Sequence, residues 1–267
     1  MLITIVSLMV KKKWIALIIV VVLIIAAIAI IGSSIPTKNQ VNVTVSKTID
    51  DHADEVLAGH SGNTAYIFNI TIKYTGSGSL STYPTNFYIV TSNGTVAADT
   101  SGFFSNVTKP LNSVTLSSGQ SVSGQIYDSF SNNVKISSIY YSYDGQHYAA
   151  PSVPAVSEWI SYIGDINVNT NDSNITAICT PGPFISSAYN SGTILTFNIS
   201  LSNDAFSSSA EVKSLTINAT SLNYSYTPKL PLTIGAGDDA YITLEMTMPN
   251  ESNYYSNINI NISAATN

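Results

Sequence analysis

The sequence predicts an all-β protein in which an N-terminal transmembrane helix precedes two β-sandwich domains. Three observations support this prediction. Residues 14–31 form an unbroken apolar run without a charge or a proline. From residue 41 onward, apolar and polar residues alternate with a period of two, which places them on opposite faces of strands. Turn residues interrupt the alternation at short intervals, and many short strands joined by turns are typical of a sandwich.

The apolar run is long enough to cross a bilayer. As a helix it would cover about 27 Å, close to the thickness of the hydrocarbon core. Lysines at positions 11–13 precede it, so the positive-inside rule predicts a cytoplasmic segment 1–13, a transmembrane helix 14–31 and export of the rest. A cleaved secretory signal is the alternative, although its apolar part is usually only ~7–15 residues long. The start is also open between Met1 and Met9.

The composition argues against nucleic acid as a partner. The chain has 10 lysines, no arginine and 16 acidic residues. Three lysines precede the predicted helix, so the exported part has a net charge of −9, whereas nucleic-acid binding requires clustered lysine and arginine. Only 10% of the residues are charged, and we expect a surface of Ser, Thr, Asn and Tyr, without a cofactor. The single cysteine, Cys179, is expected to be a small buried hydrophobe.

The first predicted sandwich spans residues 41–150, after a polar connector at residues 32–40. Its clearest strand lies at residues 64–74, where the side chains on one face are Tyr66, Phe68, Ile70, Ile72 and Tyr74. Asn69 falls on the opposite face. Asn93-Gly94 and Asp144-Gly145 are strong tight-turn pairs, and the second predicts a hairpin at the end of this domain.

A proline-rich linker at residues 151–157 separates this domain from the second predicted sandwich, residues 158–267. Pro151 and Pro154 cannot donate backbone hydrogen bonds, and they stiffen the chain. In the second domain Phe197 is predicted to point inward and Asn198 outward, and the last strand alternates isoleucine with asparagine. The segment around Phe197 parallels the one around Phe68, which indicates that one sandwich type occurs twice.

The first domain resembles a known family. A long strand at residues 66–72 precedes a small polar loop at 76–79, a strand that ends at Asn93-Gly94, a glycine turn within residues 116–124, and a strand at 139–141. This order is similar to the telokin-like, immunoglobulin-fold domain of unknown function found on prokaryotic secreted and membrane-anchored proteins. The resemblance covers residues 41–150 and implies an immunoglobulin-like sandwich without established catalytic residues. The composition also resembles that of archaeal surface proteins.

Sequons for N-linked glycosylation occur throughout the predicted exported part, and we expect several of them to carry glycan because such sites mark accessible backbone. They begin at Asn42, Asn69, Asn93, Asn106, Asn171, Asn174, Asn198, Asn218, Asn223, Asn250 and Asn261.

Asp50, Asp51, Asp54 and Glu55, together with His60, form the densest polar cluster. A cation such as Ca²⁺ requires several converging carboxylates, so these four acids are weak candidates for metal ligands. The D-x-D-x-D-G pattern of an EF-hand is absent. The prediction is therefore a solvated acidic loop between two strands, without a metal.

The predicted hairpin near Asp144 carries several tyrosines, of which Tyr141, Tyr143 and Tyr148 are candidates for a binding surface. Alternation places Tyr141 and Tyr143 on one face and Tyr140 on the other. Aromatic side chains in such a hairpin either pack in the core and across strands or form an exposed platform for a carbohydrate or a protein. The sequence leaves both interpretations open.

The sequence contains no G-x-S-x-G, H-E-x-x-H or C-x-x-C motif, and we do not expect an enzyme. We expect a membrane-anchored extracellular interaction or adhesion protein, or a component of the cell envelope, that carries glycan. Its partners would be the lipid bilayer, through residues 14–31, and an extracellular protein or carbohydrate. A pilin-type filament subunit is one alternative, and an extracellular hydrolase is the second.

Overall fold

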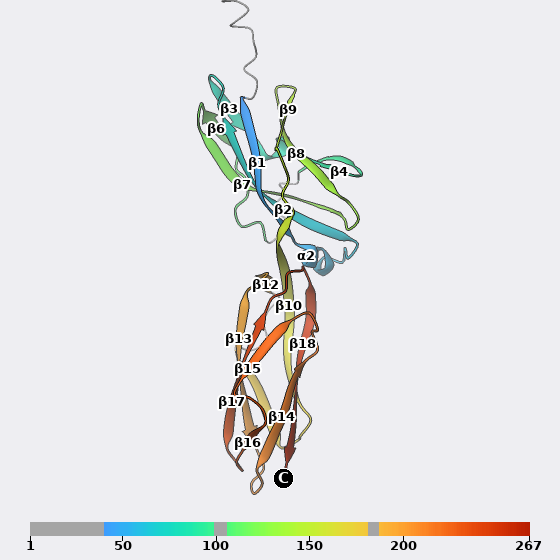
Figure 1. Cartoon of the computed structure of the whole chain (residues 1–267), viewed down its shortest axis with the longest axis vertical. Helices are drawn as coiled ribbons and strands as arrows, with labels where there is room; N and C mark the ends of the chain where they lie inside the picture. The colour runs from blue at the N-terminus through green and yellow to red at the C-terminus, as the bar shows by residue number, and fades with distance from the viewer. Residues whose placement is uncertain (1–39, 99–105, 181–186) are drawn as a thin grey trace, which may run out of the picture. The chain divides into compact units, whose positions relative to one another are not determined.

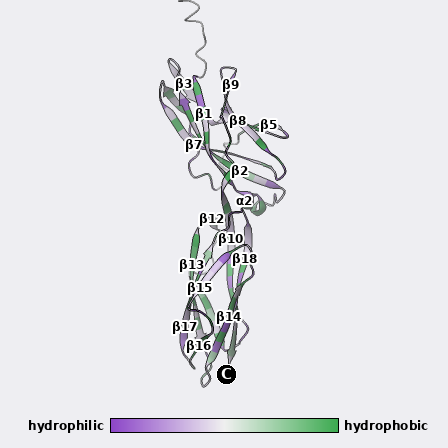
Figure 2. Ribbon diagram, viewed as in Figure 1, coloured by the Kyte–Doolittle hydropathy of each residue, from purple (hydrophilic) through white to green (hydrophobic). Residues whose placement is uncertain are grey.

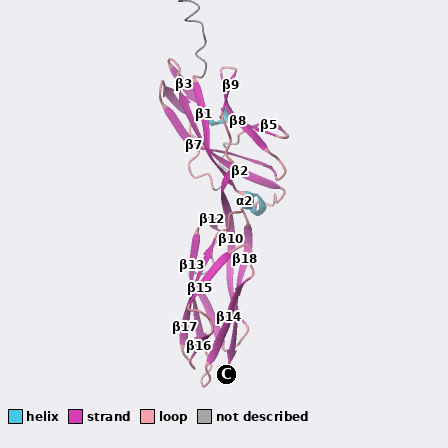
Figure 3. Cartoon of the chain, viewed as in Figure 1, coloured by secondary structure: helices cyan, strands magenta, loops and turns pink. Residues whose placement is uncertain are grey.

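The computed structural model describes residues 40–98, 106–180 and 187–267. The predicted transmembrane helix at residues 14–31 lies outside these ranges, and within them no helix has the length and apolar character needed to cross a membrane. Strands dominate the described residues, and their one α-helix, α2 (His52–Leu57), has six residues (Figure 3). The prediction of an all-β fold is confirmed.

The first strand region comprises strands β1–β9 between residues 41 and 149 (Figure 1). The antiparallel strands β1 (Val41–Asp50), β2 (Asn63–Tyr74) and β7 (Ser121–Ser131) pair in this order, and they form one end of an eight-stranded sheet that continues into the second strand region. A second has the order β5 (Gly94–Ala97), β4 (Phe87–Thr91), β8 (Ile136–Tyr143) and β9 (Gln146–Ala149). A short sheet pairs β3 (Ser79–Thr82) with β6 (Val114–Ser117), and a 3-10 turn, η1 (Pro84–Asn86), precedes β4.

The second strand region comprises β10–β18 and is built mainly of two sheets. One contains β10 (Val156–Thr170), its partners β12 (Ser187–Asn190) and β18 (Tyr254–Thr266), and then β14 (Ala210–Ile217) and β16 (Leu232–Ile234). The other has the order β11 (Ile175–Thr180), β13 (Ile194–Asn203), β17 (Asp239–Thr247) and β15 (Asn223–Thr227). Buried side chains from both sheets form one hydrophobic cluster, so the sheets enclose a shared core.

The predicted alternation explains which side chains fill the two cores. Phe68 is 0% exposed in the core of the first region, and Phe197 is 1% exposed in the core of the second. Asn69 is half-buried and Asn198 is exposed, so each asparagine lies on the outer face of its strand. The predicted strand registers are confirmed, and the alternating hydropathy is visible along the ribbon (Figure 2). Cys179 is only half-buried against the second core.

The predicted Asp144-Gly145 turn is confirmed between β8 and β9. Asp144 has φ of 48° and Gly145 has φ of 69°. Two successive residues with positive φ are what a two-residue turn needs in order to match the twist of the paired strands. The turn brings β9 alongside β8, with Tyr143 opposite Gln146.

Strand β10 connects the two regions. Its start pairs in parallel with the end of β1, and its later residues pair with β12 and β18. Residues 160–164 are buried one after another, because this stretch is covered on both faces. Gly164 lies here, and a Cβ at this position would be 2.5 Å from the backbone oxygen of Ser256. The strand begins at Val156, within the predicted linker; the proposed domain boundaries stay a prediction.

Candidate functional site

The acidic cluster folds into helix α2, which follows β1 directly. Asp51 immediately precedes the helix and is 0% exposed, and Glu55 within it is 3% exposed. The prediction of a solvated acidic loop is therefore wrong for these two residues. Ile49, Ala53 and Ile67 are buried in a small third cluster with side chains from β10, and this packing draws the acidic segment inward.

The Asp51 carboxylate is part of a hydrogen-bond network that reaches β10. The Nδ2 atom of Asn106 donates to Asp51 Oδ2 over 2.8 Å and to the Tyr162 hydroxyl oxygen over 2.7 Å. The Tyr162 hydroxyl in turn donates to Asp54 Oδ1 over 3.1 Å. The other carboxylate oxygen of Asp51, Oδ1, is buried without a hydrogen-bond partner. An unsatisfied buried oxygen of this kind is costly when it is charged.

Burial raises the pKa of Asp51 from 3.8 to about 7. The side chain of Asn106 and the backbone N–H of Asp54 lower this pKa, whereas the negative charges of Asp54 and Asp50 raise it further. Burial also raises the pKa of Asp50 and of Asp54. The segment therefore favours protonated carboxyl groups, because removal from water disfavours the charged form and neighbouring acids repel it.

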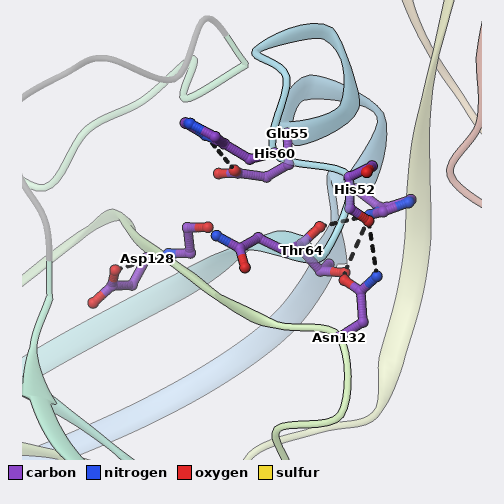
Figure 4. Close-up of polar contacts among 9 residues, drawn as sticks. His52, Glu55, His60, Thr64, Asp128 and Asn132 are labelled. Atoms are coloured by element: carbon purple, nitrogen blue, oxygen red, sulfur yellow. Dashed lines mark hydrogen bonds and ion pairs between the residues drawn. The ribbon is translucent and has the colours of Figure 1, made fainter.

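The remaining side chains of the cluster hold the turn between α2 and β2 (Figure 4). His60 Nδ1 lies 3.3 Å from Glu55 Oε2. His52 Nδ1 lies 2.6 Å from the Asn63 backbone oxygen, and Thr64 Oγ1 donates to Asn132 Oδ1 over 2.8 Å. These contacts account structurally for both histidines. Across the described ranges, no group of three or more His, Cys, Asp or Glu side chains is placed to hold a metal ion.

The candidate tyrosines lie on the core-facing side of their hairpin. Tyr141 is 0% exposed, and its hydroxyl accepts a hydrogen bond from the Tyr83 backbone nitrogen and donates to the Ser81 backbone oxygen. Tyr143 and Tyr148 are half-buried against the first core. Tyr141 therefore cannot contribute to an exposed binding surface, and the structure corrects that prediction.

The outward face of the same sheet carries a different aromatic row, made of Tyr88 on β4, Tyr140 on β8 and His147 on β9. The Tyr88 and Tyr140 rings are stacked with centroids 5.2 Å apart, and Tyr140 stacks on His147 at 4.3 Å. His147 is exposed and both tyrosines are half-buried. Because the rings stack on one another, their faces partly cover each other. Alternation places Tyr140 and Tyr141 on opposite faces, but the outward direction of Tyr140 follows from packing, and the position of Tyr88 opposite Tyr140 follows from the strand register.

A comparison of Tyr141 with Tyr140 tests the assignment of Tyr141 to the core-facing side of the sheet and of Tyr140 to its outward face. We expect Tyr141→Phe to lower the free energy of unfolding by about 1 kcal/mol, because it removes a hydroxyl that makes two hydrogen bonds. Tyr140→Phe, one residue away on the outward face, should change it by less than about 0.5 kcal/mol. Chemical denaturation of the two variants measures the difference. A larger loss for Tyr140→Phe would contradict the assigned faces.

The sequon asparagines divide into an exposed majority and two half-buried residues. The exposed ones are Asn42, Asn93, Asn171, Asn174, Asn198, Asn218, Asn223, Asn250 and Asn261. Asn69 is half-buried, and its Oδ1 accepts a hydrogen bond from Gln125. Asn106 is half-buried and already uses its Nδ2 atom, the glycan attachment atom, in two hydrogen bonds. The exposed sequon asparagines are thus accessible for glycosylation, whereas the Asn106 amide is engaged in hydrogen bonds to Asp51 and Tyr162.

The arrangement of sheets and surfaces defines an all-β protein whose exposed strand residues are mostly uncharged and polar. Residues 32–147 match the model of a family described as a domain of unknown function, DUF4352. This agrees with the predicted resemblance of the first half to a domain of unknown function, and the match covers less than half of the chain.

No curated protein matches the sequence. Two solved structures of a bacterial adhesin from Mobiluncus mulieris, which contains intramolecular disulfide, isopeptide and ester bond cross-links, align with 86% of this chain and 100% of their own. Their sequence identity to this chain is 7%, and the TM-scores are 0.19 and 0.17. TM-scores this low support no inference about function.

Proposed function

We propose that the chain is a membrane-anchored extracellular interaction protein, an adhesion or cell-envelope protein without enzymatic activity. In this proposal residues 1–13 are cytoplasmic, residues 14–31 span the membrane, and the two strand regions are immunoglobulin-like sandwiches outside the cell. The first sandwich is of the telokin-like type, and the source is archaeal. The sequence of the apolar run and its preceding lysines support the topology.

The observation that carries this proposal is the exposure of most sequon asparagines, some on outer strand faces and the others in turns. In β13, Phe197 is buried and the adjacent Asn198 is exposed. Thr243 donates a hydrogen bond to Asn198 Oδ1, which leaves the Nδ2 atom for a glycan. An outer face of mostly uncharged polar side chains with accessible attachment atoms suits a protein that works outside the cell.

Glycopeptide mass spectrometry of the protein from its native source tests the proposal. We expect glycan on Asn198 and none on Asn106, because the Asn106 amide is engaged by Asp51 and Tyr162. Ser200→Ala should remove the Asn198 glycan without changing the asparagine, and Ser200→Thr should retain it because the sequon survives. Unmodified Asn198 together with glycan on Asn106 would contradict the accessibility that the proposal assumes.

The partner in this proposal is an extracellular protein or carbohydrate. The row of Tyr88, Tyr140 and His147 is the best candidate for contact among the described residues, because it is the stacked aromatic group that faces outward. Its hydroxyl groups and ring edges suit hydrogen bonding to a polar ligand, while the stacked faces give the row rigidity. Tyr143 and Tyr148 lie on the other face of this sheet, half-buried against the first core.

A pilin-type filament subunit is the alternative that the apolar run at residues 14–31 also permits. There, cleavage behind the lysines at positions 11–13 would release a helix that packs in a filament core. The two functions predict different mature N-termini: an end before the lysines for the anchored protein, which keeps them, and an end directly after the lysines for the subunit. Intact-mass measurement of the mature protein distinguishes them.

A further inference from the structure

The contacts between α2 and the second strand region form a defined junction. It consists of residues 50–57, the start of β10, and residues 251–253 ahead of β18. The Ala53 backbone nitrogen donates to Ser252 Oγ over 2.9 Å, and the Ser252 hydroxyl donates to the Ile160 backbone oxygen. Lys47 on β1 and Glu158 on β10 form an ion pair beside it. Apolar side chains from both regions bury one another here.

One polar network crosses this junction and includes a buried carboxyl group. Asn106 joins Asp51 to Tyr162, and Tyr162 joins Asn106 to Asp54. The first strand region supplies Asp51, Asp54 and Asn106, and the second supplies Tyr162. Asp51 Oδ1 is buried within the network without a partner. Separation of α2 from β10 would expose this oxygen to water, so its protonation state is coupled to closure of the junction.

We propose that the junction of α2 with β10 is a pH-operated latch, which is closed when Asp51 is protonated and weakened when Asp51 is ionised. When Asp51 is protonated, the closed junction buries a neutral carboxyl group whose Oδ1 atom has no hydrogen-bond partner. After ionisation the same buried oxygen carries negative charge next to two other acids. Burying such a charge without a partner costs much more than burying a neutral group.

The direction of the pH dependence follows from the two protonation equilibria. The pKa of Asp51 is about 7 in the closed junction, compared with 3.8 for an ordinary aspartate. Between these values the closed form holds a proton that the open form has released. Raising the pH through this interval therefore disfavours the closed form. The ratio of closed to open junction falls by about tenfold for each pH unit. Above about pH 7 both forms are ionised and the weakening is complete.

The titratable groups around Asp51 reinforce this direction. Asp50 on β1 and Asp54 on α2 both raise the pKa of Asp51. Other titratable groups in or beside the junction include His52 and Glu55 on α2, Tyr66 on β2, Glu158 and Tyr162 on β10, Glu251 ahead of β18 and Tyr254 on β18. Glu158 is paired with Lys47. The His52 imidazole acts on the Asp50 carboxylate, and Tyr162 reaches Asp51 through Asn106. The charges that act on Asp51 itself are acidic, so ionisation brings repulsion rather than pairing.

Hydrogen exchange of helix α2 in the full chain tests the latch. The amide of Ala53 donates across the junction, so its protection reports closure. After correction for intrinsic exchange, protection of residues 52–57 should fall at least about tenfold between about pH 5 and about pH 8. Asp51→Asn, which mimics the protonated acid, should keep protection high and independent of pH. Asp165→Asn, an exposed change on β10, is the control and should behave like the unchanged protein.

A second variant keeps the test decisive if Asp51→Asn does not fold. Tyr162→Phe removes the hydroxyl that joins Asn106 to Asp54. It should lower the protection of α2 at about pH 5 and keep the fall toward about pH 8, because Asp51 is unchanged. Protection in the unchanged protein that is flat across this pH range would overturn the proposal. A fall that persists in Asp51→Asn would also overturn it, since another group would then be responsible.

Discussion

Phe68→Ala is expected to lower the free energy of unfolding by about 3–5 kcal/mol, because it leaves a cavity in a closed core. Phe68 is fully buried and stacks on Tyr66 with ring centroids 6.4 Å apart. It lies opposite Thr48 of β1 and Ile126 of β7, at the centre of its sheet. A loss of this size is a large part of the ~5–15 kcal/mol that usually stabilises a folded protein.

Asn69→Gln is the matched control for that change. Asn69 is the next residue on the same strand, but it is half-buried on the outer face and its oxygen accepts one hydrogen bond from Gln125. We expect a loss below about 1.5 kcal/mol, the scale of one such bond. Denaturation curves of the two variants, both without glycan, give the comparison. If the asparagine change were the more damaging, the assigned faces of β2 would be inverted, since a one-residue slip exchanges them.

Asn203→Ala should destabilise the second strand region by about 3 kcal/mol, because buried carbonyl groups lose their donor. The Nδ2 atom of Asn203 donates to the backbone oxygens of Ser208, Ile234 and Gly235. Its Oδ1 atom accepts from the Ala205 nitrogen, and the residue is almost fully buried. One side chain thus fixes the turn after β13 against the segment after β16.

Asn198→Ala provides the control on the same strand, because Asn198 is exposed and makes one side-chain hydrogen bond. Thermal unfolding of unglycosylated protein should show a clear loss for Asn203→Ala and little change for Asn198→Ala. Equal melting temperatures for the two variants would mean that the Asn203 hydrogen bonds do not stabilise the fold.

Strands with one buried and one polar face could be predicted from the sequence. In β18, Ile258, Ile260 and Ile262 are buried as their alternation with asparagine predicts. Strand β10 gives no alternating signal where it enters the junction, because residues 160–164 are buried one after another on both faces of the strand. Helix α2 was missed because six residues are too few to show a helical period.

The surfaces were harder to predict than the strands. Alternation separates Tyr140 from Tyr141, but it does not say which face turns inward. That depends on packing with distant segments: the Tyr141 hydroxyl accepts a hydrogen bond from the Tyr83 backbone nitrogen and donates one to the Ser81 backbone oxygen. The burial of Asp51 depends on β10, more than 100 residues further along the chain. Asn203 carries no local signal, because its partners follow it by up to 32 residues.

Protease treatment of intact cells tests the central claim most directly, namely that residues 41–267 are displayed outside a membrane that the preceding segment anchors. A tag at the C-terminus reports the fate of the exported part, and lysed cells serve as the control for cleavage. We expect added protease to remove the tag from intact cells, and the untreated protein to stay with the membrane fraction. Complete protection of the tag in intact cells, with cleavage after lysis, would contradict the proposed topology.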